Sequence, residues 1–452
     1  MKLMKSLLLG SVAGFAAVAG AQAADLPSKK AAPVEYVRVC SQFGAGFFYV
    51  PGSDTCLKVY GRVRADYIYN EPLTRGSNTT TTRARGYFRL DSYTPTDWGP
   101  LRATTGIYIT RDSGRGFNAN GVNLANVSNG NGSTNADVAL DWAYIQFAGI
   151  TAGRIPVSFF EFAPFGGVTY LGGGSNGRGS DYGATNVLAY TATFGGGFSA
   201  TLAIEDGTER RGAAVVAGGA GFIVNGANLG AVPYAGHAMP DIVGRLDYTG
   251  TWGTAMLSGA VHQVRAGNGV LFGAANAIAD TVYGYAIQGG VKVNLPMLAP
   301  GDALFLQAAY ANGANSYTGW SSLGLGFQNT PVNGIVTPDV VYDALGNDHT
   351  TKTWSIVGGL LHYWTPTIRQ GVALAYGKHD AWGSWQDMSA FTAATNVIWS
   401  PVKGFDIGAE VGYQRLTDTP NVVYNAANVA AGSLFGLKKD AWFGRLRFQR
   451  DF

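Results

Sequence analysis

Six basic side chains stand on alternating positions in three short segments near the start of the chain. They are Lys58, Arg62, Arg64, Arg85, Arg89 and Arg102. Because successive side chains of a β-strand point to opposite faces, the cations of each segment would share one face. If the three segments pair as neighbouring strands, the cations form one basic patch. The alternative is that nearby acids, Asp66 and Asp91, neutralise them.

The two cysteines of the chain are Cys40 and Cys56. In an oxidising compartment they can form a disulfide that closes a short loop, worth roughly 3 kcal/mol in the chain-entropy model. The alternative is a metal-binding or catalytic pair. It is disfavoured because all five histidines lie beyond residue 236. The sequence therefore predicts a structural disulfide and no metal site.

The histidines give little support for a catalytic site, because none of them stands in a GxSxG or HExxH motif. Three fall in predicted loops and two near predicted strand ends, the five being His237, His349, His379, His262 and His362. Catalysis would require a nucleophile with a positioned base. We therefore interpret the histidines as polar loop or inward-facing residues, and predict neither an enzyme nor a cofactor.

The elements that must position the basic patch are amphipathic strands. In the last segment, 440–452, the apolar face carries Trp442, Leu446 and Phe448, and alternating positions carry charged or polar groups. Sixteen such segments can be counted. The first two are 57–69 and 84–94, and the last is 440–452. The connections between them are alternately short and long, as in the meander of an outer-membrane barrel. The Gly-rich stretch 212–236, within one long connection, is predicted to be a flexible loop.

The composition narrows the class of protein. Only 13% of residues are charged, 65 are Gly, and the formal net charge is +3, which argues against a nucleic-acid surface. The 23 Tyr, 23 Phe and 10 Trp argue against disorder. The better-defined strands have about ten to thirteen residues, the length that crosses a bilayer at a tilt. A secreted sandwich usually has shorter strands. We therefore predict an all-β, transmembrane, 16-stranded antiparallel β-barrel over 57–452, with short periplasmic turns and long external loops.

Residues 1–23 have the features of a signal peptide. Lys2 and Lys5 precede an apolar stretch, and Ala21-Gln22-Ala23 is a small-residue cleavage site. Residues 24–56 would then form an N-terminal segment with the disulfide. Signal-peptide-dependent export predicts a location in the outer membrane of a Gram-negative bacterium, in contact with outer-membrane lipid.

The third long connection, 156–184, is rich in Phe and Tyr as well as Gly. Such rings need a surface on which to pack, so we expect this loop to fold inward against the barrel wall and narrow the channel. It would then present Glu161 and Asp181 opposite the arginines. The resulting transverse field would favour small polar solutes over apolar ones.

Several blocks of the sequence carry a resemblance to a known family. They are GAQAADLP at the end of the signal peptide, 36–64, 141–162, 400–415 and the terminal Phe452. Over essentially its whole length the chain resembles the general porins of alphaproteobacteria, as in rhizobia and Brucella. The resemblance implies a homotrimer of 16-stranded barrels with an inward-folded third loop. It also implies that Phe452 is the signal read by the outer-membrane assembly machinery.

The expected function is passive diffusion of small hydrophilic solutes and ions through a water-filled channel. The alternative is a substrate-selective channel for an anion or a sugar. A sugar channel should carry an aromatic track, and the inward aromatic residues expected here, Tyr60, Tyr87 and Tyr108, make a weak one. A barrel acting as an enzyme or adhesin is a third hypothesis, and no nucleic-acid partner is expected.

Overall fold

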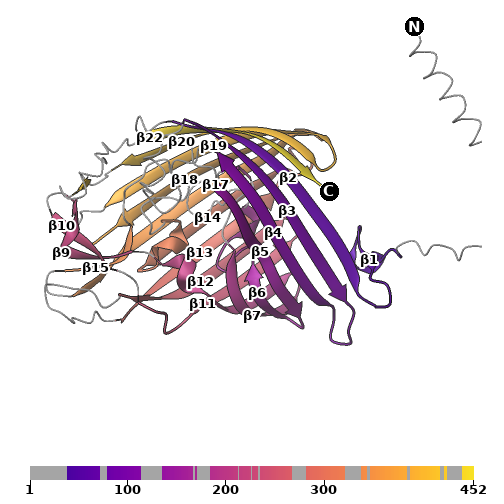
Figure 1. Ribbon diagram of the computed structural model, residues 1–452, viewed down its shortest axis with the longest axis horizontal. Helices are drawn as coiled ribbons and strands as arrows, with labels where there is room; N and C mark the ends of the chain where they lie inside the picture. The colour runs from indigo at the N-terminus through magenta and orange to yellow at the C-terminus, as the bar shows by residue number, and fades with distance from the viewer. Residues whose placement is uncertain are drawn as a thin grey trace, which may run out of the picture.

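In the computed structural model the chain forms a β-barrel (Figure 1). The structure describes residues 38–71, 79–113, 135–165, 168–170, 184–211, 213–224, 227–232, 235–266, 281–320, 337–343, 347–383, 387–417, 422–424 and 440–452. The barrel strands are β2 (Cys56–Asn70), β3 (Thr80–Thr94), β4 (Leu101–Ser113), β5 (Asn135–Phe147), β6 (Ile150–Ile155), β7 (Thr185–Gly195), β8 (Phe198–Glu205), β11 (Asp241–Gly250), β12 (Gly253–Arg265), β13 (Thr281–Asn294), β14 (Ala303–Asn312), β17 (Lys352–Thr365), β18 (Ile368–Asp380), β19 (Met388–Val402), β20 (Phe405–Thr417) and β22 (Asp440–Asp451).

Each of these strands pairs antiparallel with the next one in the barrel. The sheet closes where β2, the first barrel strand, pairs with β22, the last, with Arg64 opposite Gln449. The predicted all-β, 16-stranded antiparallel barrel is thereby confirmed. The largest shift of a predicted boundary is at β3, which begins at Thr80 rather than at residue 84. Hydrogen bonding to β2 extends the strand beyond the point where the alternation of apolar residues stops.

The outer and inner faces of the barrel differ in the way that a lipid environment requires. On β13 the outward Tyr283, Tyr285 and Ile287 are 56%, 49% and 50% exposed, while the alternate positions are buried. Exposed large apolar side chains recur on the outer face of the other strands, among them Leu202 and Leu246. Such a continuous apolar exterior would be unfavourable in water and is favourable in hydrocarbon. Among the described residues, no helix has the length and apolar character needed to cross a membrane.

A second, smaller sheet is made by three of the long connections. Its strands are β9 (Ala213–Val224), β10 (Ala227–Val232), β15 (Pro338–Tyr342), β16 (Asp348–Thr350) and β21 (Val422–Tyr424). The prediction of a flexible loop over 212–236 was therefore wrong, because this stretch contains the hairpin of β9 and β10. Within this hairpin, β9 also pairs with β15, in parallel, and with β21, antiparallel. Those partners lie far away in sequence, and local composition gives no sign of them.

The remaining elements are short. They are β1 (Phe48–Tyr49), which pairs with the start of β2, and the 3-10 helices η1 (Ser41–Phe43), η2 (Ala163–Phe165), η3 (Gly207–Arg210) and η4 (Asn315–Thr318). The first two of these five lie before the barrel, at the end that carries the short turns. The other three lie in long connections. Of these, η4 contacts the barrel strands β14 and β17, and η3 contacts other long connections, as described below.

Candidate functional site

The six predicted basic residues all lie on the inward face of β2, β3 and β4. The register places Arg64 opposite Arg85, Tyr60 opposite Arg89 and Tyr93 opposite Arg102. Outward neighbours such as Val59 and Val63 are exposed, whereas these cations are buried or half-buried. The inward side of these strands, together with that of β5 and β22, is called the basic wall below.

Acids on the basic wall neutralise part of its charge. Arg89 and Arg102 share Asp91, at 2.6 and 3.5 Å. Asp66, the other acid expected to serve these cations, instead pairs with Arg447 of β22 at 2.6 Å. Arg62 pairs with Asp451. The sequence alone does not identify Arg447 or Asp451 as a partner, because the two ends of the chain meet only when the barrel closes.

Aromatic rings lie between the cations of the basic wall. The guanidinium carbon of Arg85 lies 4.3 Å from the ring centre of Tyr108, and that of Arg89 lies 4.4 Å from Trp142. Arg102 lies 5.3 Å from Tyr144. A guanidinium over a ring face is attracted by the ring quadrupole, so these contacts hold the cations in fixed orientations.

Trp142 and Tyr144 were missed in the sequence analysis because of a β-bulge. The pairing of β4 with β5 shifts by one residue, so that Ile107 faces Leu140 while Gly106 faces Trp142. The extra residue is Asp141. Strict alternation would place Trp142 on the face of Leu140, and the bulge instead turns it toward the lumen. The aromatic track is therefore longer than Tyr60, Tyr87 and Tyr108 alone.

The described part of 156–184 packs along the inner side of strands β8 to β20. Ser258 of β12 donates to the Phe160 carbonyl at 2.6 Å, and Asn396 of β19 donates to the Val168 carbonyl at 3.1 Å. The ring of Phe162 covers Gly290 of β13, where any side chain would collide with it. Further along, the Tyr170 ring lies 4.3 Å beneath the guanidinium of Arg447. Burial raises the pKa of Tyr170 to about 12, so this phenol stays neutral beside the cation.

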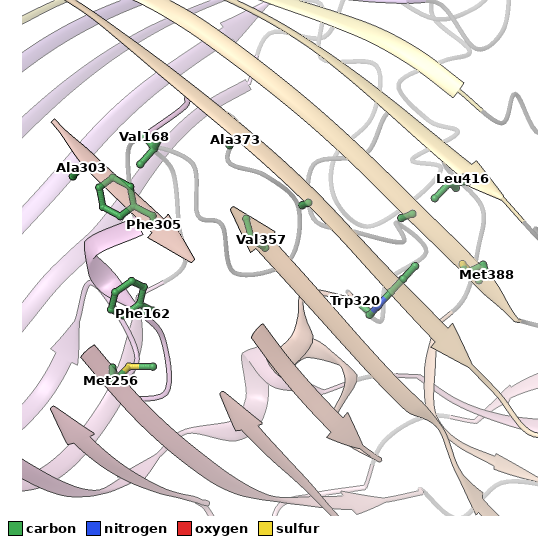
Figure 2. Close-up of a cluster of buried hydrophobic side chains, with 12 residues drawn as sticks. Phe162, Val168, Met256, Ala303, Phe305, Trp320, Val357, Ala373, Met388 and Leu416 are labelled. Atoms are coloured by element: carbon green, nitrogen blue, oxygen red, sulfur yellow. The ribbon is translucent and has the colours of Figure 1, made fainter. Parts of the chain in front are cut away.

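An apolar cluster joins the segment 156–184 to the inner faces of several barrel strands and to Trp320, which lies in a second long connection (Figure 2). Phe162 and Val168 lie beside Met256, Phe305 and Val357 of β12, β14 and β17. Trp320, which follows η4, lies in the same cluster, next to Met388 and Leu416. Two long connections thus cover the inner face of this side of the barrel, and the described residues place no such cover over Arg62, Arg89 and Arg102.

Glu161 has a different partner from the one expected. Its side chain is fully buried, and Arg210 of η3 donates to it at 2.7 Å. It therefore does not stand open to the arginines of the basic wall. Burial by itself would lower the pKa of Arg210, but Glu161 together with Tyr317 and Glu205 outweighs this effect and raises the pKa. The other predicted acid, Asp181, lies outside the described residues.

The pair of Glu161 and Arg210 belongs to a network that joins three long connections. Arg210 lies 4.5 Å over the ring of Tyr317 in η4. Tyr317 donates to Asp241 at 2.6 Å, and the same carboxylate contacts His262 at 2.9 Å. Burial raises the pKa of Tyr317 well above its usual value, so the phenol remains a donor. His262 thus has a structural partner, and in the described ranges no group of acids, histidines or cysteines is arranged to hold a metal ion.

The predicted disulfide between Cys40 and Cys56 is confirmed, with an S–S distance of 2.00 Å. Both cysteines are fully buried, and the rings of Phe43, Phe47 and Tyr93 pack around them. Because Tyr93 belongs to the basic wall, the disulfide fastens the N-terminal segment to that wall at the end of the barrel with short turns.

Comparison with solved structures agrees with the barrel. The outer membrane channel DcaP of Acinetobacter baumannii is similar with a TM-score of 0.54 and 17% identity, over 90% of this chain and 99% of that one. OmpT of Vibrio cholerae, in its trimer form, is similar with a TM-score of 0.51 and 10% identity, over 88% and 100%. At these identities the likeness shows the fold.

Sequence comparison identifies the family. The chain is 32% identical to porin Omp2b of Brucella suis over 457 residues, 99% of this chain and 100% of that one. It is 30% identical to porin Omp2b of Brucella abortus (strain 2308) over 458 residues, 99% of each. The model of the porin subfamily matches residues 25–443. The chain therefore belongs to the porin subfamily.

Proposed function

We propose that this chain forms a water-filled channel in the outer membrane for passive diffusion of small hydrophilic solutes and ions. The observation that carries the proposal is the closed barrel of sixteen strands, apolar outside and charged or polar inside. A barrel of this strand number is wide enough to leave an aqueous lumen, whereas eight strands would be filled by their own side chains. The family is consistent with this function.

The segment 156–184 is the element that narrows this channel in our proposal. Its described residues lie against the inner wall through Ser258, Asn396 and the surface of Gly290. The free cross-section would then lie between this cover and the basic wall. Arg62, Arg89 and Arg102, whose side chains are 31%, 21% and 23% exposed, would line it.

The charge of that lining favours anions over cations. The half-buried Arg89 and Arg102 share the carboxylate of Asp91. The cations on the inward faces of β2, β3 and β4 outnumber the acids on the same faces, so a net positive charge remains on this part of the wall. This surplus supports the anion-selective alternative as a graded preference within a general pore. A potential that is positive along one wall raises the local concentration of anions and lowers that of cations.

Several further parts of the proposal rest on sequence and resemblance. Residues 1–23 would direct export and be removed, and residues 24–56 would form the disulfide-bonded N-terminal segment. Phe452 would be read by the assembly machinery, and three copies would assemble in outer-membrane lipid. Chemical cross-linking of the protein in native membranes tests the last point, and a protein that remains monomeric there would contradict it.

Planar-bilayer recording of the purified, folded protein tests the function itself. We expect stepwise current increments that rise linearly with voltage, and a reversal potential on the anion side in a KCl gradient. Heat-unfolded protein from the same preparation is the control. Folded protein that produces no current steps would overturn the proposal.

A further inference from the structure

The basic wall carries a compact cluster of cations and rings near the barrel end with short turns. We call it the Asp91 cluster, and it consists of Asp91, Arg89, Arg102, Trp142 and Tyr144. Arg102 is the second residue of β4, directly after the turn from β3, and Asp91 lies three residues before the end of β3. Three neighbouring strands, β3, β4 and β5, therefore bring the cluster together.

The charges of the Asp91 cluster do not balance. Arg89 donates to one oxygen of Asp91 at 2.6 Å, and Arg102 lies 3.5 Å from the other. Thr104 also donates to this carboxylate, at 2.7 Å, so its accepting capacity is largely used. The Nε atoms of Arg89 and Arg102 have no hydrogen-bond partner within the described part of the chain. Asp91 therefore serves two guanidinium groups. Asp141, the residue before Trp142, is a second acid on this wall and interacts with Tyr87. Because Lys58 lies opposite Asp91 in the register, the cations in and beside the cluster still outnumber these two acids.

Aromatic rings flank both guanidinium groups of the cluster. Arg89 lies 4.4 Å from the ring centre of Trp142 and 5.2 Å from that of Tyr60. Arg102 lies 5.3 Å from Tyr144 and 5.4 Å from Tyr93. The centres of Trp142 and Tyr144 are themselves 6.3 Å apart. Flat apolar surface and cationic donors thus alternate over a short distance on the wall.

The N-terminal segment extends this aromatic surface. Phe43 stacks on Tyr93 with ring centres 4.8 Å apart, and Phe47 meets the same ring edge-on at 5.4 Å. Lys58, beside Asp91 in the register, donates to the Ala45 carbonyl at 3.1 Å and lies 5.7 Å over the ring of Phe47. The disulfide-bonded segment therefore places the rings of Phe43 and Phe47 next to the cluster, and Lys58 of β2 adds a basic side chain there.

We infer that the Asp91 cluster is a subsite for small organic anions in which a carboxylate is attached to a flat, apolar ring. The carboxylate would pair with the half-exposed guanidinium groups, which match its geometry. The ring would pack on the neighbouring aromatic side chains. Chloride satisfies only the charge, and a saturated ring of the same size satisfies the charge without the π surface. This inference rests on the proposed function, because solutes must reach the lumen.

Bi-ionic reversal potentials with potassium benzoate and potassium cyclohexanecarboxylate test the inference. The two acids have the same charge and nearly the same size, so their permeability ratio isolates the flat ring. We expect benzoate to be a few-fold more permeant and to reduce chloride current at millimolar concentration. Equal permeabilities in the unmodified channel would overturn the inference. A protein that gives no current in KCl would instead overturn the proposed function.

Variants then assign the preference to the cluster. We expect Trp142→Leu to bring the benzoate ratio close to one, and Trp142→Phe to retain most of it. Arg102→Gln should lower the permeability of both acids relative to potassium. Trp399→Leu, the same change on the outward face of β19, is the matched control and should leave the ratio unchanged. A ratio that survives Trp142→Leu would contradict the assignment, and heat-modifiable mobility on gels verifies that each variant is folded.

Discussion

Gly61 and Phe452 show how a single position can control closure of the barrel. Their backbones exchange hydrogen bonds of 2.8 and 2.9 Å, and the terminal ring lies over Gly61 on the outer face of β2. A side chain at position 61 would occupy the space of that ring. The terminal aromatic residue, which we propose as an assembly signal, therefore also stabilises the pairing of the first barrel strand with the last.

Gly61→Val should destabilise the folded barrel by about 1–3 kcal/mol, the usual cost of overpacking. Equilibrium unfolding in urea from lipid vesicles measures this free energy without the cellular assembly machinery. The matched control is Gly86→Val on the adjacent strand β3, where an added Cβ would meet no atom within 4 Å. Equal stabilities of the two variants would contradict the close contact between Gly61 and Phe452.

Arg62 allows the selectivity of the wall to be tested at one residue. A unit charge acts on an ion in water about 8 Å away with about 0.5 kcal/mol, roughly a twofold effect. Arg62→Gln should therefore lower the chloride-to-potassium permeability ratio by about twofold, measured as a reversal potential in a KCl gradient. Arg415→Gln removes the same charge from an exposed, outward position of β20. Similar shifts in both variants would mean that Arg62 does not line the ion path.

At the scale of elements, the long connections hold one another in place. The Arg210 side chain in η3 joins Glu161 of the third connection to Tyr317 in η4. The serine next to Tyr317 strengthens the link, because the Ser316 hydroxyl donates to the Arg210 carbonyl at 2.8 Å. Removing Arg210 would leave the buried carboxylate of Glu161 without this cation, and the loss of one partner of a buried ion pair typically costs about 3–5 kcal/mol.

Arg210→Gln is therefore expected to loosen the segment 156–170, giving noisier single-channel currents and faster proteolysis within it. The neighbouring Arg211, which donates to His237 at 2.8 Å, supplies the control variant Arg211→Gln. Removing both charges in Glu161→Gln with Arg210→Gln should recover part of the lost stability, because no buried charge is then left behind. Quiet currents and unchanged proteolysis in Arg210→Gln would show that the segment is held in another way.

The sequence predicted the strands well and the contacts between loops poorly, for a physical reason. A strand such as β22 is recognisable because lipid and water impose opposite chemistry on alternate residues. The partner of Glu161 depends instead on where three long connections meet in space. The residues next to Arg210 in the sequence do not indicate that it pairs with Glu161. The bulge at Asp141 is similar, since one extra residue moved Trp142 to the lumen without changing the apolar pattern. Hence the fold and the basic wall could be predicted, but the full aromatic lining could not.

At the scale of the whole molecule, the barrel is asymmetric inside and uniform outside. The inner face from β8 to β20 is covered by segments that pack through Phe162, Val168 and Trp320. The opposite inner face presents arginines and rings. The outer face repeats apolar residues on every side, as the low overall content of charge requires. Few charges are present, and many of those described are concentrated on one strip of the lumen wall.

The uniform exterior leads to a prediction that depends on depth in the bilayer. Leu246 lies in the middle of β11 and is 56% exposed, while Leu101 is the first residue of β4 and is 37% exposed. An arginine on the lipid face costs about 2–4 kcal/mol at the bilayer midplane and about 0–1 kcal/mol near the interface. Leu246→Arg should therefore destabilise the barrel in vesicles far more than Leu101→Arg does. The same pair measured in detergent micelles, where water reaches the protein surface more easily, should differ less. If the two variants were equally stable in vesicles, the outward face of β11 would not lie in hydrocarbon, and the transmembrane placement of the barrel would have to be abandoned.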